Sequence, residues 1–307
     1  MGRPTDHDVD LGFDQVAILR RLERDWHDFR SPEFWRRLNP QLTVSEQPVK
    51  AGGAPSVAVS AELAESARKQ LDDLGFFVTP PLIPAALMAP VREAVETLAA
   101  VGIPSGFVAV YDEVYQCFGS VRSLFEPLLG ADYLWVADGL WVFLVPAGAP
   151  ARNGLLSPFA AHRDSLGPDP AVVGGGRPTI LTVWIPLTDV SPAESCLYVV
   201  PRSADDQFQS GAQGVTADSV DLQSIRAVPA AAGSVVAWST HLIHWGSRSW
   251  ADARGPRIAI TTYFQRADVP PFHESVFRPT ENIALETRLR WVVKSMGGHD
   301  LVKRLSS

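Results

Sequence analysis

The chain has 307 residues, 46% of them hydrophobic, which is the composition of a soluble globular protein. A formal net charge of −7 argues against a basic surface for nucleic acid or an anionic membrane. The two cysteines, Cys117 and Cys196, are too few for a disulfide framework or a thiolate zinc site. No apolar run reaches the roughly 18 residues of a membrane span, and the acidic N-terminus lacks a signal-peptide core. We therefore expect a cytoplasmic protein without a membrane or nucleic-acid partner.

The first third of the chain has the periodicity of helices. Apolar residues recur at helical spacing over 14–38. A second amphipathic helix is predicted over 60–74, with Ser60 as its N-cap and Gly75 directly after its end. A short strand is predicted in "FFVTPPLIP", and a proline then opens another predicted helix over 84–101.

From about residue 106 the pattern changes to short β-branched and aromatic runs separated by Gly, Pro, Asn and Asp. These runs are "DYLWVADGLWVFLVPAG", "RPTILTVWIPLTDV", "SCLYVVPRS", "GSVVAWSTHLIHWGS" and "RIAITTYFQRA". Helices followed by strands predict an α+β protein in which helices pack on a β-sandwich or jelly roll. We expect one domain over 1–307, with a mainly helical part over 1–105, the β core over 106–270 and a helical segment over 271–307.

The stretch "FAAHRDSLGP" places His162 two residues before Asp164. In an extended segment these two side chains leave the same face, and Arg163 leaves the opposite face, where we expect a surface ion pair. Far along the chain, "WSTHLIHWGS" offers His241 and His244, whose odd spacing puts them on opposite faces of a strand. Two histidines and one carboxylate with free coordination positions form the facial triad typical of non-haem Fe(II) oxygenases.

An arginine follows the distal histidines on a run with the pattern of the next strand. Arg257 in "GPRIAI" can form a bidentate pair with a carboxylate, which would anchor the far end of an iron-chelating 2-oxo acid. Arg254, in the preceding loop, is the alternative anchor. Asp189 lies in a proline-rich turn, so we expect it to bind backbone donors rather than a metal.

In order and spacing, these segments resemble the phytanoyl-CoA dioxygenase-like (PhyH) branch of the Fe(II)/2-oxoglutarate-dependent oxygenases. The resemblance rests on "HRD", "ILTVWIPLTDVSPAESCLYVVPRS", "LIHWGS" and "PRIAIT", which span about 159–264, and on "LGFFVTPPLIP" near 75–84. It implies a double-stranded β-helix core (jelly roll, cupin-like) with flanking α-helices from the N-terminal third and the C-terminal tail. It also implies Fe(II) and O2, with 2-oxoglutarate as cosubstrate.

The resemblance assigns roles position by position. It implies that His162, Asp164 and His244 bind the iron, and it thereby selects His244 over His241. It further implies that Arg257 binds the C5 carboxylate of 2-oxoglutarate.

Further residues are candidates for the cosubstrate site. Ser247 resembles the family's serine near 2-oxoglutarate. Thr182 and Trp184 share one face of a strand and are candidate pocket residues, although the strand pattern leaves open whether that face points inward. The sequence departs from the family where Ser195 and Cys196 replace a glycine after the acidic turn, and where "PRSA" replaces "PGSH".

The resemblance implies an Fe(II)/2-oxoglutarate-dependent dioxygenase that releases succinate and CO2. The family does not determine the substrate. We expect a small molecule, such as a secondary-metabolite scaffold or a modest amphipathic compound. Hydroxylation is the expected outcome, with desaturation, epoxidation or ring formation as alternatives. Asp164 argues against halogenation, because iron halogenases of this broad class lack the carboxylate ligand. A cupin-type metal-dependent hydrolase or isomerase is a second interpretation, which leaves Arg257 without a role. A non-catalytic jelly-roll binding protein is the third.

Two connections are expected to control access of the substrate. They are the long polar loop 204–226 and residues 147–160, which precede "HRD". Loops can close over a site and exclude water where strands cannot, so we expect substrate to protect at least one of them. No feature of the sequence specifies an oligomeric state.

Overall fold

The computed structural model describes residues 15–45, 49–50, 56–149, 161–164, 177–211, 215, 220–273, 275–278, 281–296, 298 and 301–302. The helices precede, flank and follow the strands. They are α1 (Gln15–Arg24), α2 (Trp26–Phe29), α3 (Pro32–Leu38), α4 (Ala61–Leu74), α5 (Ala85–Ala100), η1 (Ser105–Val110), α6 (Asp112–Ser120), α7 (Arg122–Leu129), η2 (Ala137–Gly139), η3 (Arg202–Ala204), η5 (Leu222–Ser224) and α8 (Leu285–Ser295). The strands are β1 (Val49–Lys50), β2 (Phe76–Val78), β3 (Leu134–Val136), β4 (Trp141–Val145), β5 (Ile180–Pro186), β6 (Leu197–Val200), β7 (Arg226–Val228), β8 (Val236–Ser239), β9 (Ile243–Gly246), β10 (Arg257–Gln265), β11 (Val276–Phe277) and β12 (Asn282–Ile283).

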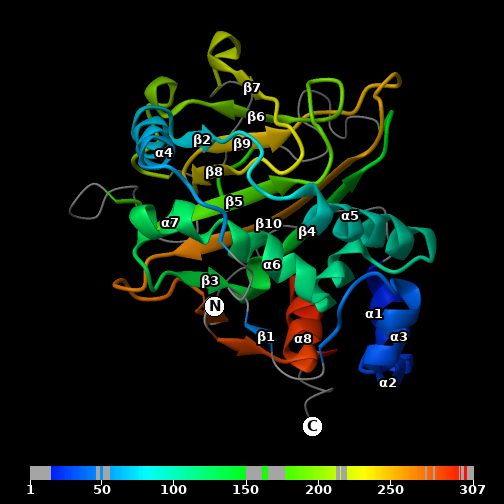
Figure 1. Cartoon of the computed structure of the whole chain (residues 1–307). Coiled ribbons are helices and arrows are strands. Elements are labelled where there is room, and N and C mark those ends of the chain that lie inside the picture. The colour runs from blue at the N-terminus through cyan, green and yellow to red at the C-terminus, as the bar shows by residue number, and fades with distance from the viewer. Residues whose placement is uncertain are drawn as a thin grey trace.

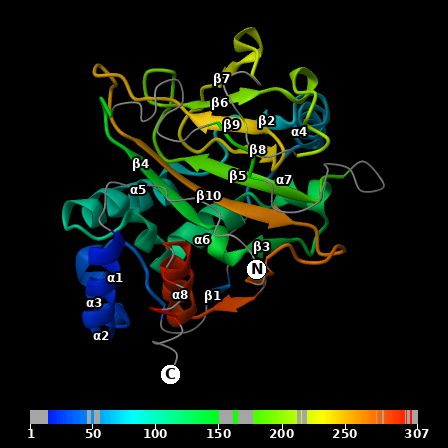
Figure 2. The same ribbon diagram turned by 180° about the vertical axis from the view of Figure 1, so that it is seen from behind.

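The described strands form two main antiparallel sheets. The larger sheet has the order β11-β3-β10-β5-β8-β2, with β4 also paired to β10, and the smaller sheet has the order β7-β6-β9. In Figure 1 the smaller sheet lies at the top, β5 and β10 cross the middle, and α5, α6 and α8 lie below. Figure 2 shows the same arrangement from behind. This is a double-stranded β-helix core with flanking helices, so the predicted α+β fold class is confirmed.

Strand β5 is buried on both faces, and its alternating side chains belong to two different cores. Leu181, Val183 and Ile185 pack in the large core between the sheet and the helices. Trp184 belongs to the core between the two sheets, and Thr182 lies on the same face of the strand. Thr182 and Trp184 therefore point inward, which the strand pattern alone left open.

The helix predicted over 60–74 is confirmed. The Ser60 hydroxyl accepts a hydrogen bond from the Leu63 amide at 3.2 Å and so caps α4. At the other end Gly75 adopts a left-handed φ of 83°, a conformation that glycine adopts without strain. The turn leads directly into β2, which pairs with β8 at the edge of the larger sheet.

The predicted change from helix to strand near residue 106 is wrong for the segment up to Leu129. Helices η1, α6 and α7 occupy this stretch, and β3 is the first strand after them. The physical reason is that η1 and α6 are buried on nearly all sides, so their apolar residues form no single stripe with helical period. Within the described residues, no helix is both long and apolar enough to span a bilayer. The single-domain organisation stays a prediction.

A buried ion pair ties helix α8 to helix α6. Arg288 Nη1 donates to Asp112 Oδ1 at 2.6 Å and to the Val110 carbonyl at 2.6 Å. The side chains of Arg288 and Asp112 are 0% and 3% exposed. Because neither charge reaches water, removal of one leaves the other buried without its counterion.

We predict that Arg288→Met lowers the free energy of unfolding by about 3–5 kcal/mol, since it leaves Asp112 as an uncompensated buried charge. Urea denaturation followed by circular dichroism measures this. Arg68→Ala is the control, because Arg68 pairs with Glu65 and Asp72 on an exposed helix face and its loss should leave stability almost unchanged. Equal losses in the two variants would contradict a special role for the buried pair.

Candidate metal centre

Three side chains with metal-ligand chemistry meet in the described structure. The ligand atoms of His162, Asp164 and His244 all lie within 4.8 Å of one another. Asp164 Oδ1 is 3.6 Å from His162 Nε2 and 3.6 Å from His244 Nε2. This is the two-histidine, one-carboxylate set that the sequence predicts, drawn from segments far apart in the chain.

A short antiparallel bridge brings the two segments together. The His162 amide donates to the His244 carbonyl at 3.1 Å, and the His244 amide donates to the His162 carbonyl at 3.0 Å. The two rings leave the same side of this bridge, with centroids 4.4 Å apart. Since side chains alternate along an extended segment, Asp164 joins His162 on that side.

One carboxylate oxygen of Asp164 faces the histidines, and the other one accepts two hydrogen bonds. Its Oδ2 accepts hydrogen bonds from Thr182 Oγ1 at 2.6 Å and from Trp238 Nε1 at 3.0 Å. Burial raises the pKa of Asp164, but the neighbouring His244 and His162 and the Thr182 hydroxyl outweigh burial and hold the pKa well below its usual range. The carboxylate is therefore ionised at neutral pH, with Oδ1 available to a metal.

The protonation of His244 also suits a ligand. Its Nδ1 lies 3.0 Å from the Leu242 carbonyl, which can only accept, so the proton sits on Nδ1 and Nε2 keeps its lone pair. Burial lowers the pKa of His244 to about 4, despite the opposing effect of Asp164. The imidazole is therefore neutral at neutral pH. The His244 side chain is 7% exposed and that of His162 33%, so the cluster opens towards solvent on the His162 side.

His241, the competing histidine, points elsewhere. Its Nδ1 contacts the Phe208 carbonyl at 2.9 Å, and its ring packs so closely on Gly211 that a Cβ there would lie 2.6 Å away. Within the described residues the metal-ligand cluster does not contain His241. The predicted orientation away from His244 is confirmed, and His241 has a structural role.

Arg257 is a buried cation at the first position of β10. Nη1 donates to the Ser195 carbonyl at 2.7 Å, and the guanidinium lies 5.7 Å from the centre of the Phe143 ring. Burial lowers the pKa of Arg257 to about 10, so it remains charged at neutral pH. Its Nε has no hydrogen-bond partner among the described residues, and no carboxylate among them forms an ion pair with it. A buried charge matched so poorly indicates a site for an anion.

The strand that carries His244 also passes the Arg257 guanidinium. Gly246 lies two residues after His244 on β9, and a Cβ at this glycine would lie 2.7 Å from Arg257 Nη1. Alternate residues of a strand share a face, and two residues span about 7 Å. The Arg257 guanidinium and the His244 ring therefore lie on the same face of β9, beside positions two residues apart.

Arg254, the alternative anchor, is already paired. Its Nε and Nη2 donate to Glu194 at 3.0 and 3.2 Å, and its side chain is 70% exposed. The contact with Arg254 and that with Ser191 lower the pKa of Glu194 to about 2, so the pair is fully charged at neutral pH. An exposed and neutralised guanidinium is a weaker anion site than the buried Arg257.

The remaining predicted cosubstrate residues have other contacts in the structure. The Thr182 hydroxyl donates to Asp164, and Trp184 packs in the core between the sheets. The Ser247 hydroxyl donates to the Arg248 carbonyl at 3.2 Å. A direct contact of these three side chains with 2-oxoglutarate stays a prediction.

Ser195 explains one departure from the family pattern. It is the non-glycine residue with positive φ among those described, at 60°, and it stands where the resemblance expects glycine. Its carbonyl is the acceptor for Arg257. The backbone conformation that favours glycine is thus retained here without glycine.

Sequence reasoning missed Trp238. This residue is the cross-strand partner of Thr182 in the pairing of β5 with β8, so the two side chains share the inner face. Alternation along β8 is the signal that could have found Trp238 once the pairing of the strands was known. The indole N–H of Trp238 is one of the two donors that hold Asp164.

The expected surface pair of Arg163 is wrong, whereas the expected role of Asp189 is confirmed. Arg163 does leave the face opposite to the ligands, but it is 2% exposed and pairs with the buried Asp205. The reason is that the loop after β6 covers this face, which strand alternation cannot reveal. Asp189 accepts a hydrogen bond from the Ala232 amide at 2.8 Å, as expected for a turn residue.

The predicted access segments are described only in part. Residues 150–160 of the segment 147–160 lie outside the described residues, and so do 212–214 and 216–219 of the loop 204–226. Control of substrate access by these segments stays a prediction.

Comparison with known proteins identifies a related family. Residues 130–254 match the family model "Phytanoyl-CoA dioxygenase (PhyH)". This segment includes His162, Asp164 and His244 and ends before Arg257. No curated protein matches the chain.

The chain is similar to several solved structures. The non-heme monooxygenase ThoJ, in its apo form, is 14% identical, and the match covers 78% of this chain and 98% of ThoJ with a TM-score of 0.56. The non-heme alpha ketoglutarate dependent epimerase SnoN from nogalamycin biosynthesis is 17% identical, with 68% of this chain and 85% of SnoN covered and a TM-score of 0.46. The carbocyclase SnoK from the same biosynthesis is 19% identical, with coverages of 72% and 87% and a TM-score of 0.47. At these identities the similarity to ThoJ concerns the fold alone.

We predict that the cluster binds one divalent metal ion. His244→Ala should abolish stoichiometric binding of Co(II), because it removes one of three protein ligands, whereas His241→Gln should bind Co(II) as the wild type does. Titration followed by the visible absorption of the bound ion measures both. Loss of binding in His241→Gln with retention in His244→Ala would overturn the choice of distal ligand.

Proposed function

The chain is a phytanoyl-CoA dioxygenase-like protein over residues 130–254, and from this premise we propose that it is an Fe(II)/2-oxoglutarate-dependent oxygenase that hydroxylates a small molecule. The observation that carries the proposal is the combination of the His-Asp-His cluster with the buried and poorly matched Arg257. A cupin-type hydrolase or isomerase would use the cluster but leaves Arg257 without a role. A non-catalytic jelly-roll protein accounts for neither feature.

The cofactors of this family are Fe(II), 2-oxoglutarate and O2, and the residues present fit them. We propose that His162, Asp164 and His244 bind the iron. When bound, iron and 2-oxoglutarate supply the activation of O2 that yields succinate and CO2. Three protein ligands leave coordination positions free for the cosubstrate and O2.

The chain's own residues keep Asp164 in one orientation. Thr182 and Trp238 both donate to Oδ2, so the carboxylate offers only Oδ1 on the side of the histidines. A carboxylate held in this way would offer the iron one ligand oxygen instead of two. Retention of this ligand disfavours halogenation, and hydroxylation is the simplest oxidation compatible with the site.

Arg257 is the proposed anchor for the C5 carboxylate of 2-oxoglutarate. A guanidinium can donate two parallel charge-assisted hydrogen bonds to a carboxylate, and burial strengthens them because water does not compete. Gly246 contributes by lacking a side chain where the guanidinium lies. Ser247, the next residue, is a further proposed contact at this end of the cosubstrate.

The proposal is tested by anaerobic reconstitution with Fe(II) and 2-oxoglutarate, followed by addition of O2 and candidate small molecules. We expect succinate to form only when Fe(II), 2-oxoglutarate and O2 are all present, and a matching substrate to increase its rate of release. Mass spectrometry of the product distinguishes hydroxylation, a gain of one oxygen, from desaturation or ring formation, a loss of two hydrogens. Turnover that requires the metal but not 2-oxoglutarate would favour the hydrolase or isomerase instead.

Arg257→Lys should raise the 2-oxoglutarate concentration needed for half-maximal succinate release by at least about tenfold, because lysine cannot reproduce the bidentate pair. Gly246→Ala should act in the same direction, since its Cβ would meet Arg257 Nη1 at 2.7 Å and displace the guanidinium. Arg254→Lys is the matched control and should leave the requirement unchanged. An effect confined to Arg254→Lys would identify Arg254 as the anchor.

A further inference from the structure

We propose that the buried Arg163–Asp205 ion pair is a positioning device for the metal site. It holds the two ligand-bearing segments, residues 161–164 and 241–244, against each other and against the loop that follows β6. The inference rests on the proposed function, because positioning has a purpose only if these segments bind a metal.

The pair itself is charged, bidentate and almost completely buried. Arg163 Nη1 lies 2.5 Å from Asp205 Oδ2, and Nη2 lies 3.0 Å from Asp205 Oδ1. The two side chains are 2% and 5% exposed. Two parallel bonds define the orientation of a guanidinium plane, so this contact restricts rotation as well as distance. Arg163 lies between His162 and Asp164 in the chain, and its orientation therefore constrains both ligands.

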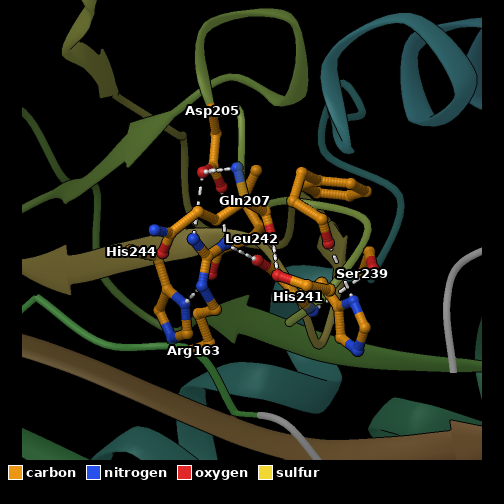
Figure 3. Close-up of polar contacts among 9 residues, drawn as sticks. Arg163, Asp205, Gln207, Ser239, His241, Leu242 and His244 are labelled. Carbon is orange, nitrogen blue, oxygen red and sulfur yellow. Dashed lines mark hydrogen bonds and ion pairs between the residues drawn. The ribbon is translucent and has the colours of Figure 1, made fainter. Parts of the chain in front are cut away.

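A third contact of Arg163 reaches the distal segment. Nη1 also donates to the His241 carbonyl at 2.5 Å, in the turn that joins β8 to β9. The next residue in that turn, Leu242, provides the carbonyl that accepts from His244 Nδ1 at 3.0 Å. Figure 3 shows Arg163 between Asp205 on one side and this turn on the other. The Arg163 guanidinium thus links the segment that carries His162 and Asp164 to the turn whose backbone orients His244.

The loop after β6 is attached to the same turn at a second point. The Asp205 carboxylate accepts a hydrogen bond from the Gln207 amide at 3.1 Å, which fixes the start of a turn. In the same loop, the Phe208 carbonyl lies 2.9 Å from His241 Nδ1. Gly211 has a φ of 59° and leaves room for the His241 ring. The described first part of the predicted access loop is therefore part of the scaffold behind the ligands.

Among the described residues, the ligand-bearing segment 161–164 is joined to a strand at one point. Within the part of the chain that the structure describes, residues 161–164 pair with a strand only through the single bridge between His162 and His244. Ala161 adds a small apolar contact with the cluster of Val200, Ile243 and Trp245. The ion pair is thus a buried, bidentate contact on the face opposite to the metal ligands, and metal affinity should depend on it.

The test compares two buried Arg–Asp pairs of the same chain. Asp205→Asn weakens the proposed positioning pair, and Asp112→Asn weakens the equally buried pair with Arg288, which lies in the helical layer. We expect Asp205→Asn to lower the affinity for Co(II) by about 10–100-fold, the usual effect of losing a residue that orients metal ligands. Asp112→Asn should keep the wild-type affinity, although both variants unfold at lower temperature. If Asp205→Asn does not fold, Arg163→Lys is the milder variant. It retains the positive charge but cannot form the two parallel hydrogen bonds of the guanidinium.

Hydrogen exchange of the metal-free protein provides the second measurement. Amides of residues 161–164 and 241–246 should exchange faster in Asp205→Asn than in wild type, and at the wild-type rate in Asp112→Asn. Wild-type Co(II) affinity together with unchanged exchange in these segments would show that the pair contributes stability alone and would overturn the proposal. If the wild type itself binds no Co(II), the proposed function fails, and exchange in the metal-free protein still decides whether Arg163 and Asp205 couple the segments.

Discussion

Burial of charge in and around the metal cluster is the constraint on which the rest of the site depends. A charged side chain removed from water is costly unless opposite charge or hydrogen-bond donors meet it. Arg163 is met by Asp205, and Asp164 by two hydrogen-bond donors and two histidines. Arg257 is met by one carbonyl among the described residues. The pair of Arg163 and Asp205 is a contact between segments of the scaffold, whereas Asp164 is both well matched and a proposed metal ligand. The incomplete matching of Arg257 is what the proposed anion would complete.

The two faces of the larger sheet have different roles: one packs against the helices, and the other carries polar groups of the site. On the helical face, Phe264 of β10 packs against Trp135 and Phe125 with ring centroids 5.2 and 4.8 Å away. On the inner face of the same strand, Arg257 and Thr261 are buried polar groups. A strand anchored by an apolar core on one side can hold a poorly matched charge on the other, since the packing on the helical side supplies the stability.

The residues predicted correctly are those whose signal is local. The two-residue spacing of His162 and Asp164 needs only the period of an extended segment, and the opposite directions of His241 and His244 follow from the same period. The N-cap Ser60 and the terminal Gly75 define a helix through contacts within one turn. By contrast, η1 and α6 are buried on nearly all sides, so no local period distinguishes them from buried strands.

By itself, the sequence determined the α+β class, the ligand types and their order along the chain, because these depend on local spacing and residue chemistry. Only the tertiary structure decided which partners meet across long separations. Strand pairing brought Trp238 and Thr182 to one oxygen of Asp164, and the covering loop turned the expected surface pair of Arg163 into a buried one. The physical reason is that register and loop placement arise from packing of the whole chain, whereas a side chain's face on its own strand is set by backbone geometry.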